Sequence, residues 1–124
     1  MPRVMLVDDD ETMTSLLQTF LQFEGFEVAL PGVDDSFAAI LESIRREQPD
    51  LVLLDINLRR FSGFDLLHAL RQDSELHPTR VLMSSGMDYA MRCYQEGADA
   101  FLLKPYMPEE LIGKIWQTIE KSPE

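Results

Sequence analysis

Five short apolar runs, separated by segments with helical periodicity, set the strongest limit on how this chain can fold. Most of the runs are rich in branched residues and none alternates apolar with polar side chains, so they are expected to form strands buried on both faces. The runs are residues 4–7, 26–30, 51–54, 81–83 and 100–103. Strands of this kind are typical of a parallel sheet covered by helices on either side.

The segments between the runs carry apolar residues at helical spacing. The first stripe is Met13, Leu16, Leu17, Phe20 and Leu21, and the last is Ile112, Ile115, Trp116 and Ile119, which is expected to face inward. Pro108, followed by two glutamates, is typical of the start of the last helix. The sequence therefore predicts an α/β fold of five βα units, built on a single doubly wound five-stranded parallel sheet.

Length and charge narrow the class of protein further. The 124 residues are enough for one domain, and 22 acidic against 11 basic residues give a formal charge of −11. Such a charge disfavours direct binding to a nucleic-acid backbone or to an anionic membrane. A single cysteine, Cys93, allows no internal disulfide, and neither a signal peptide nor a membrane-spanning run is recognisable. We therefore expect a cytoplasmic protein.

Chemically active side chains follow four of the five predicted strands. Asp8, Asp9 and Asp10 follow the first strand, and Asp55 follows the third. The fourth and fifth runs lead into Ser84-Ser85 and Lys104-Pro105. In doubly wound sheets, sites form at the carboxyl ends of strands where the strand order reverses. With the order 2-1-3-4-5, Asp8, Asp9 and Asp55 would converge at that point.

Carboxylates gathered in this way suit Mg²⁺, which binds hard oxygen ligands and leaves positions open for phosphate oxygens. A phosphoryl-transfer site is therefore expected. Asp55 would be the nucleophile, Lys104 would neutralise charge on the moving phosphoryl group, and Ser85 would donate a hydrogen bond to it.

Five motifs in order, "VDDD", "LLDINL", "SGFDLL", "MSSG" and "FLLKPY", closely resemble the receiver domain of two-component response regulators. The resemblance runs from Arg3 to about Ile119 and implies a flavodoxin-like (βα)5 fold with strand order 2-1-3-4-5. It implies a receiver domain over residues 1–120, with 121–124 as a polar tail or the start of a linker.

The resemblance also implies a role for each site residue. Asp55 would be the phosphoacceptor, Asp9 a direct Mg²⁺ ligand, and Asp8 a ligand through water or a residue just outside the coordination sphere. The backbone carbonyl of Asn57 would complete the protein's part of the metal coordination.

The remaining positions match the switch residues of the family. Ser85 and Lys104 occupy the places of the switch hydroxyl and the lysine, and Phe101 that of the switch aromatic. A cis peptide bond is implied between Lys104 and Pro105.

The function implied is that of a switch in a two-component system or phosphorelay. A sensor histidine kinase or a histidine phosphotransfer protein would donate the phosphoryl group, and the domain would catalyse its own modification without being a turnover enzyme. The expected output surface comprises the fourth helix, the fifth strand and the fifth helix, through which an output domain, a protein partner or a homodimer would be regulated.

Three positions depart from the family pattern. Arg59 stands where proline is usual, which frees a backbone N–H and is expected to loosen the loop. Nineteen positions separate Ser85 from Lys104, about three fewer than the family pattern, so the fourth helix or the loop before it should be short. Met87 follows Ser85 by two positions and brings no proton-transfer group.

Two other functions remain open from the residues. Asp8-x-Asp10-x-Thr12 also fits the first motif of haloacid-dehalogenase-type phosphatases, with Asp8 as the nucleophile, although Asp10 is better explained as a helix N-cap. Such an enzyme would require a further strand with paired acids after Lys104. The second alternative is a metal-independent pseudo-receiver that serves only as a docking module.

Overall fold

The computed structural model describes residues 1–120, and the predicted tail or linker at 121–124 lies outside the described residues. Strands and helices alternate through this part of the chain. The strands are β1 (Arg3–Val7), β2 (Glu27–Ala29), β3 (Leu51–Asp55), β4 (Arg80–Ser85) and β5 (Ala100–Leu103). The helices are α1 (Glu11–Phe23), α2 (Phe37–Glu47), α3 (Gly63–Gln72), α4 (Ala90–Gln95) and α5 (Pro108–Ile119).

The five strands form one parallel sheet in the order β2-β1-β3-β4-β5, which confirms the predicted fold. β1 and β3 are neighbours, and Val7 pairs with Leu54. The residues that directly follow this pair, Asp8 and Asp55, therefore reach the same level at the carboxyl edge of the sheet. The strand order reverses between β1 and β3, so this edge is where a doubly wound fold places its site.

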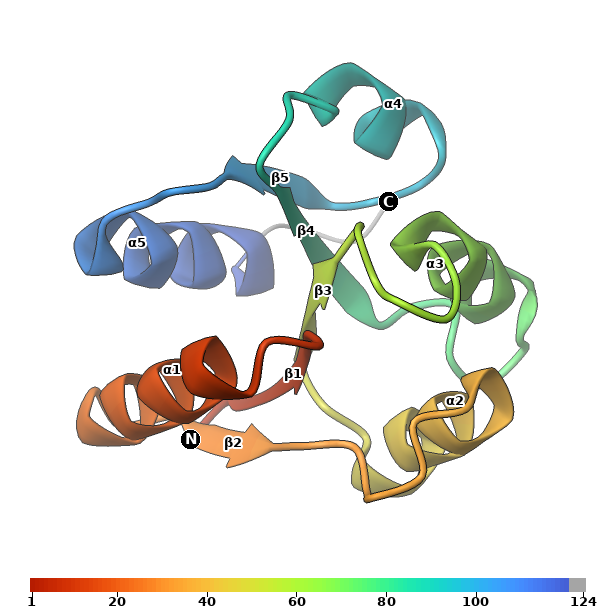
Figure 1. Cartoon of the computed structure of the whole chain (residues 1–124), viewed down its shortest axis with the longest axis horizontal. Helices are drawn as coiled ribbons and strands as arrows, with labels where there is room; N and C mark the ends of the chain where they lie inside the picture. Colours follow the sequence, from red (N-terminus) through yellow and green to blue (C-terminus); the bar gives the residue numbers. More distant parts are fainter. Residues whose placement is uncertain (121–124) are drawn as a thin grey trace.

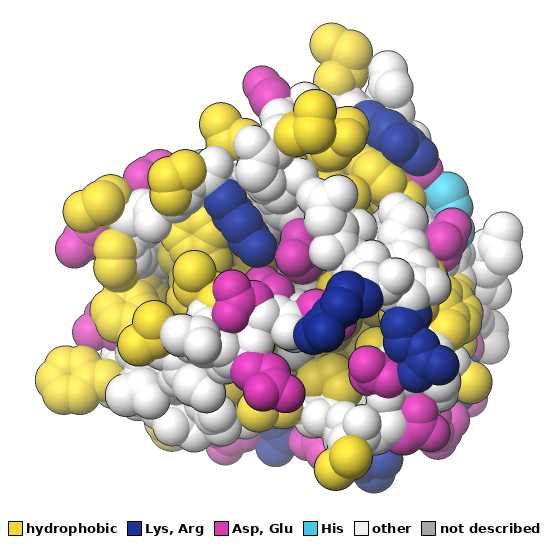
Figure 2. Space-filling model, viewed as in Figure 1, with side chains coloured by type: hydrophobic (Ala, Val, Ile, Leu, Met, Phe, Trp, Pro, Cys, Tyr) yellow, Lys and Arg dark blue, Asp and Glu magenta, His cyan; other side chains and the backbone are white. Residues whose placement is uncertain are grey.

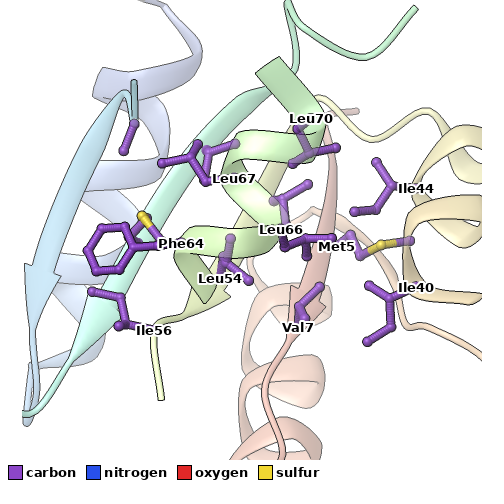
Figure 3. Packing of buried hydrophobic residues seen from close by; sticks show 14 of the residues in the cluster. Met5, Val7, Ile40, Ile44, Leu54, Ile56, Phe64, Leu66, Leu67 and Leu70 are labelled. Carbon is purple, nitrogen blue, oxygen red and sulfur yellow. The ribbon is translucent and has the colours of Figure 1, made fainter. Parts of the chain in front are cut away.

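Two apolar clusters cover the two faces of the sheet. On one face α1 and α5 pack against the strands, and on the other α2, α3 and α4 do so (Figure 1). Leu66, Leu67 and Leu70 of α3 point towards the sheet, and Ile40 and Ile44 of α2 meet Met5 of β1 beside them (Figure 3). Because both faces are buried, the strands have no polar face, which explains their continuous apolar runs.

The inward faces of α1 and α5 are narrower than predicted. In α1 only Leu21 is fully buried, and Leu16 is 63% exposed. In α5 the buried residues are Leu111, Ile115 and Thr118, whereas Trp116 is 40% exposed. The prediction that Trp116 faces inward was wrong: its ring packs at the edge of the core against Phe26, with ring centroids 5.2 Å apart. Leu17 and Phe20 of α1, and Ile112 and Ile119 of α5, are partly buried against the core, so each helix packs along a stripe whose edges reach solvent.

The fourth helix is short, as expected from the spacing between Ser85 and Lys104. α4 has six residues, against ten to thirteen in each of the other helices.

No helix among residues 1–120 is both long and apolar enough to cross a membrane.

Candidate functional site

The turn after β1 holds the first group of carboxylates. Asp10 is the N-cap of α1, because its Oδ1 accepts a hydrogen bond of 3.0 Å from the backbone N–H of Met13. Asp8 Oδ1 accepts a bond of 2.9 Å from the backbone N–H of Asp10. Asp10 is therefore committed to the helix, as predicted, while Asp8 and Asp9 remain at the edge of the sheet.

Lys104 joins the ends of three strands. Its Nζ lies 3.2 Å from Asp8 Oδ2 and 3.4 Å from Asp55 Oδ2, and all three side chains are largely buried. Burial alone would lower the pKa of the Lys104 ammonium, but the attraction of Asp8 and Asp55 outweighs it and raises that pKa above its ordinary value. Lys104 is thus a fixed cation between two carboxylates. The Lys104–Pro105 peptide bond is cis, the geometry that the resemblance implies.

Asp9 is held by a residue from a different segment, the loop between β3 and α3. The backbone N–H of Arg59 donates to Asp9 Oδ2, and Arg59 Nη2 donates to the backbone carbonyl oxygen of Asp9 at 2.9 Å. The backbone N–H that proline would lack is therefore bonded, and it ties this loop to the turn after β1. A bridge between Asn57 and Ser62, and a bond of 2.8 Å from the N–H of Gly63 to the carbonyl of Ile56, close the same loop.

Ser85 connects the end of β4 to the same loop. Its Oγ donates a hydrogen bond of 2.8 Å to Asn57 Oδ1 and accepts one of 3.2 Å from the backbone N–H of Met87. The backbone N–H of Asn57 donates in turn to Asp55 Oδ1 at 3.1 Å. Ser84, directly opposite Asp55 in the register, is buried with its Oγ unpartnered within the described residues.

Phe101 lies below the site rather than in it. Its ring is 8% exposed and belongs to the cluster that packs under α2, α3 and α4. Phe101 pairs with Met83, and strand alternation places Ser85 on the same face of the sheet as Met83. The two predicted switch residues are thus on one face, two positions apart in register.

Acidic and basic side chains lie next to one another at the site. In the space-filling view, acidic side chains gather at the middle of the face with basic side chains beside them (Figure 2). The carboxylates of Asp8, Asp9 and Asp55 are balanced in part by two cations, Lys104 and Arg59. This compensation offsets the like-charge repulsion of the cluster, about 4 kcal/mol for two charges 4 Å apart at an effective dielectric of 20.

The donor set fits a magnesium ion, although it does not form a ready-made cage. Within residues 1–120 no three His, Cys, Asp or Glu side chains are gathered closely enough to hold a metal ion as they stand. Asp8 is paired with Lys104, whereas Asp9 is paired with Arg59. Mg²⁺ uses only one or two protein carboxylates and completes its shell with water and substrate oxygens, so the residues suit it.

Sequence reasoning placed the strand-end residues correctly but missed the partner of Asp9. From the sequence, Arg59 is only a departure from the family pattern that frees a backbone N–H. The available signal was an arginine four positions after Asp55, in a loop that topology places beside the first strand end. Arg60 itself is exposed and pairs with Asp35 at 2.6 Å.

Comparison with known proteins gives a family match over most of the chain. A family model described as the response regulator receiver domain matches residues 4–116. The DNA-binding response regulator MtrA of Mycolicibacterium smegmatis is 34% identical over 113 residues, which are 91% of this chain and 48% of that protein. The transcriptional regulatory protein PrrA of Mycobacterium bovis is 36% identical over 115 residues, with 92% and 48% covered. The chain thus spans about half the length of these relatives.

Solved structures of similar proteins have the same fold. A putative response regulator from Chloroflexus aurantiacus superposes with a TM-score of 0.85 at 26% identity, covering 97% of this chain and 98% of that one. The chemotaxis protein CheY4 of Vibrio cholerae gives a TM-score of 0.83 at 25% identity, covering 95% and 98%.

Proposed function

The chain belongs to the family of response regulator receiver domains, and on this basis we propose that it accepts a phosphoryl group from a phosphohistidine donor onto Asp55. The observation that carries the proposal is the position of Lys104 between Asp8 and Asp55 at the carboxyl ends of β1, β3 and β5. A carboxylate beside a fixed cation, with a hydroxyl on the adjacent strand, has the parts that phosphoryl transfer needs.

The transfer would begin with attack of one Asp55 carboxylate oxygen on the phosphorus atom. The new O–P bond forms as the N–P bond of the phosphohistidine breaks, and the electron pair of that bond stays on the imidazole nitrogen. Lys104 keeps its proton, because its pKa is raised, and pairs with a phosphoryl oxygen as the charge around Asp55 increases.

A magnesium ion would be held by Asp8, Asp9, Asp55 and the backbone carbonyl of Asn57. When bound, it would neutralise negative charge on the phosphoryl oxygens. The domain would thereby catalyse its own modification, acting as a switch rather than as a turnover enzyme.

The conformational response would pass through Ser85 and Phe101. Ser85 Oγ, now bonded to Asn57 Oδ1, would donate to a phosphoryl oxygen instead. Its movement would change the packing around Met83 and Phe101 on the same face of the sheet. Phe101 would report this change by buried area and shape, because it has no hydroxyl.

The phosphoryl donor would be a sensor histidine kinase or a histidine phosphotransfer protein. An apolar groove of about 410 Å³ opens beside the site between α1 and the start of α5. It is lined by Met13, Leu16, Leu17, Phe20, Lys104, Pro105, Tyr106 and Pro108. Since Lys104 lines this groove and also pairs with Asp55, a histidine-bearing surface seated there would have its reactive side chain near Asp55.

The output surface would comprise α4, β5 and α5. Tyr94 of α4 is 50% exposed and Leu103 of β5 is 46% exposed, which leaves apolar area for an output domain, a partner or a second copy of the chain. MtrA and PrrA carry about as many residues again outside the matched region, and MtrA is described as DNA-binding. A DNA-binding output in the same polypeptide or in a partner fits the strongly acidic receiver, which itself disfavours DNA.

The alternatives are not favoured. A phosphatase of the haloacid-dehalogenase type would need a strand with paired acids after Lys104, and residues 105–120 contain α5 with no further strand. A metal-independent docking module would not need the cluster of Asp8, Asp9, Asp55 and Lys104.

The proposal is tested by incubating the domain with a small acyl phosphate and Mg²⁺ and measuring intact mass. One phosphoryl group should be added, and Asp55→Asn or a chelator should abolish the addition. Asp50→Asn, the same change at the opposite end of β3, is the matched control and should be labelled normally. Labelling that survives Asp55→Asn and requires Asp8 would support the phosphatase instead.

A further inference from the structure

Arg59 contacts Asp9 through both its backbone and its side chain. Its N–H donates to Asp9 Oδ2, its Nη2 donates to the Asp9 carbonyl oxygen at 2.9 Å, and its Nε lies 3.8 Å from Asp9 Oδ2. The Arg59 side chain as a whole is 77% exposed. One residue of the β3–α3 loop therefore binds the segment that follows β1 through both hydrogen bonds and an ion pair.

We propose that Arg59 competes with a divalent cation for Asp9 and so sets the magnesium affinity of the site. This inference rests on the proposed function, because it assumes that Asp9 is a ligand of Mg²⁺. Arg59 is in this view a positioning residue: it does not touch the phosphoryl group but decides when the Asp9 carboxylate is available.

The competition follows from the chemistry of the two partners. A metal ion needs a lone pair of Asp9 Oδ2, and the Arg59 N–H already uses one of the lone pairs of that oxygen. The guanidinium group adds a positive charge that repels a second cation at the same carboxylate. Mg²⁺ also demands near-ideal geometry, so the Asp9 carboxylate must turn away from Arg59 before it can coordinate.

The contact between Arg59 and Asp9 also stabilises the protein when no cation is bound. Without the guanidinium group of Arg59, Asp9 would have no ion-pair partner among the described residues, and Lys104 would remain paired with Asp8 and Asp55 alone. Repulsion within the cluster would then rise, and binding of a metal ion would relieve more of it. Loss of Arg59 should therefore destabilise the metal-free protein and strengthen metal binding at the same time.

Arg59→Gln tests this inference, because it keeps the backbone N–H and removes the guanidinium group. Arg60→Gln is the matched control: it removes the same charge one residue away, from a side chain that pairs with Asp35. In calorimetric titrations with MgCl₂, Arg59→Gln should lower the dissociation constant by about two- to fivefold, and Arg60→Gln should change it less than twofold.

Thermal unfolding gives a second readout that does not depend on phosphorylation. In excess chelator Arg59→Gln should melt below both the wild type and Arg60→Gln, and in saturating Mg²⁺ this deficit should disappear. A role in loop stability alone would leave the same deficit in both conditions and would overturn the inference. An unchanged dissociation constant in Arg59→Gln, with normal binding by the wild type, would overturn it as well. If neither protein bound Mg²⁺, the magnesium-dependent function would fail and the inference with it.

Arg59→Lys is a third variant, which keeps the charge but cannot reproduce the Nη2 bond to the Asp9 backbone. We expect a dissociation constant between those of the wild type and Arg59→Gln. A value equal to that of Arg59→Gln would show that the guanidinium geometry matters more than its charge, and would still support competition at Asp9.

Discussion

Gly63, the first residue of α3, is expected to be intolerant of even one added carbon atom. A Cβ at this position would lie 2.5 Å from the backbone oxygen of Asp55 and 2.8 Å from the Cα of Ile56. Both neighbours are backbone atoms at the end of β3, so neither can rotate away. Gly63→Ala must therefore push α3 away from the strand that carries Asp55.

The size of the effect follows from these distances. The contact with the Asp55 oxygen is about 0.9 Å shorter than an ordinary contact of 3.4 Å. Overpacking typically costs about 1–3 kcal/mol. Because the added Cβ would clash with two backbone atoms, we expect a cost at the upper end of this range. Alanine regains up to about 1 kcal/mol through its higher helix propensity. We expect Gly63→Ala to lower the free energy of unfolding by about 2 kcal/mol.

Denaturant unfolding measures this change, and Gly113→Ala is its matched control. Gly113 lies inside α5, and a Cβ there would meet no atom within 4 Å. The same substitution at Gly113 should raise the free energy of unfolding by about 0.5–1 kcal/mol. Gly63→Ala should also slow labelling of Asp55 by an acyl phosphate, because the displaced oxygen belongs to that residue.

Equal stability of Gly63→Ala and the wild type would refute this reasoning. It would mean that the loop between β3 and α3 can relax without cost, in spite of its bonds from Gly63 to Ile56 and from Arg59 to Asp9. A stability loss with unchanged labelling would show that the strain is absorbed by α3 and does not reach Asp55.

Two further predictions concern groups outside the site. Asp99→Ala should lower the free energy of unfolding by about 3 kcal/mol. The Asp99 side chain is largely buried, and its Oδ2 accepts hydrogen bonds from Arg71 Nη2 at 2.9 Å and from the Val81 N–H at 2.8 Å. In the same urea titrations Glu27→Ala, which removes an exposed ion pair, should cost less than about 1 kcal/mol. Burial raises the pKa of the Cys93 thiol from 9.0 to about 11, so between these pH values the unfolded chain loses a proton that the folded chain keeps. Stability should fall by about 2 kcal/mol from pH 9 to pH 11 through this group, and the decline measured for Cys93→Ala should be shallower by that amount; parallel curves would contradict the assignment.

The fold could be predicted because its strands carry a strong pattern. Continuous apolar runs allowed little besides a parallel sheet covered on both faces, and the strand order then placed Asp8 and Asp55 side by side. Helix faces were less predictable, as Leu16 and Trp116 illustrate. Both extend an apolar stripe that is wider than the surface the sheet can cover, so periodicity alone could not say which edge of the stripe faces solvent.

The site could be predicted only as far as strand ends determine it. Asp55, Lys104 and Ser85 are placed by the strands that precede them. Arg59 lies four residues beyond β3, and its contact with Asp9 depends on the conformation of the whole loop. Replacing a proline was correctly expected to free an N–H, but where that N–H points is a property of the loop in three dimensions.

If Ser85 is the switch hydroxyl that we propose, its hydrogen bond with Asn57 opposes the conformational response to phosphorylation. Breaking it costs about 0.5–1.5 kcal/mol net, whereas a bond from Ser85 to a charged phosphoryl oxygen contributes about 1.5–3 kcal/mol. The difference, about 1–2 kcal/mol, would change the ratio of two conformations by about five- to thirtyfold. Such a change shifts the population towards one conformation without making it the only one populated. A partner that binds only one arrangement of the surface around Phe101 would shift the population further. By the same reciprocity, that partner would strengthen retention of the phosphoryl-bound arrangement at Asp55.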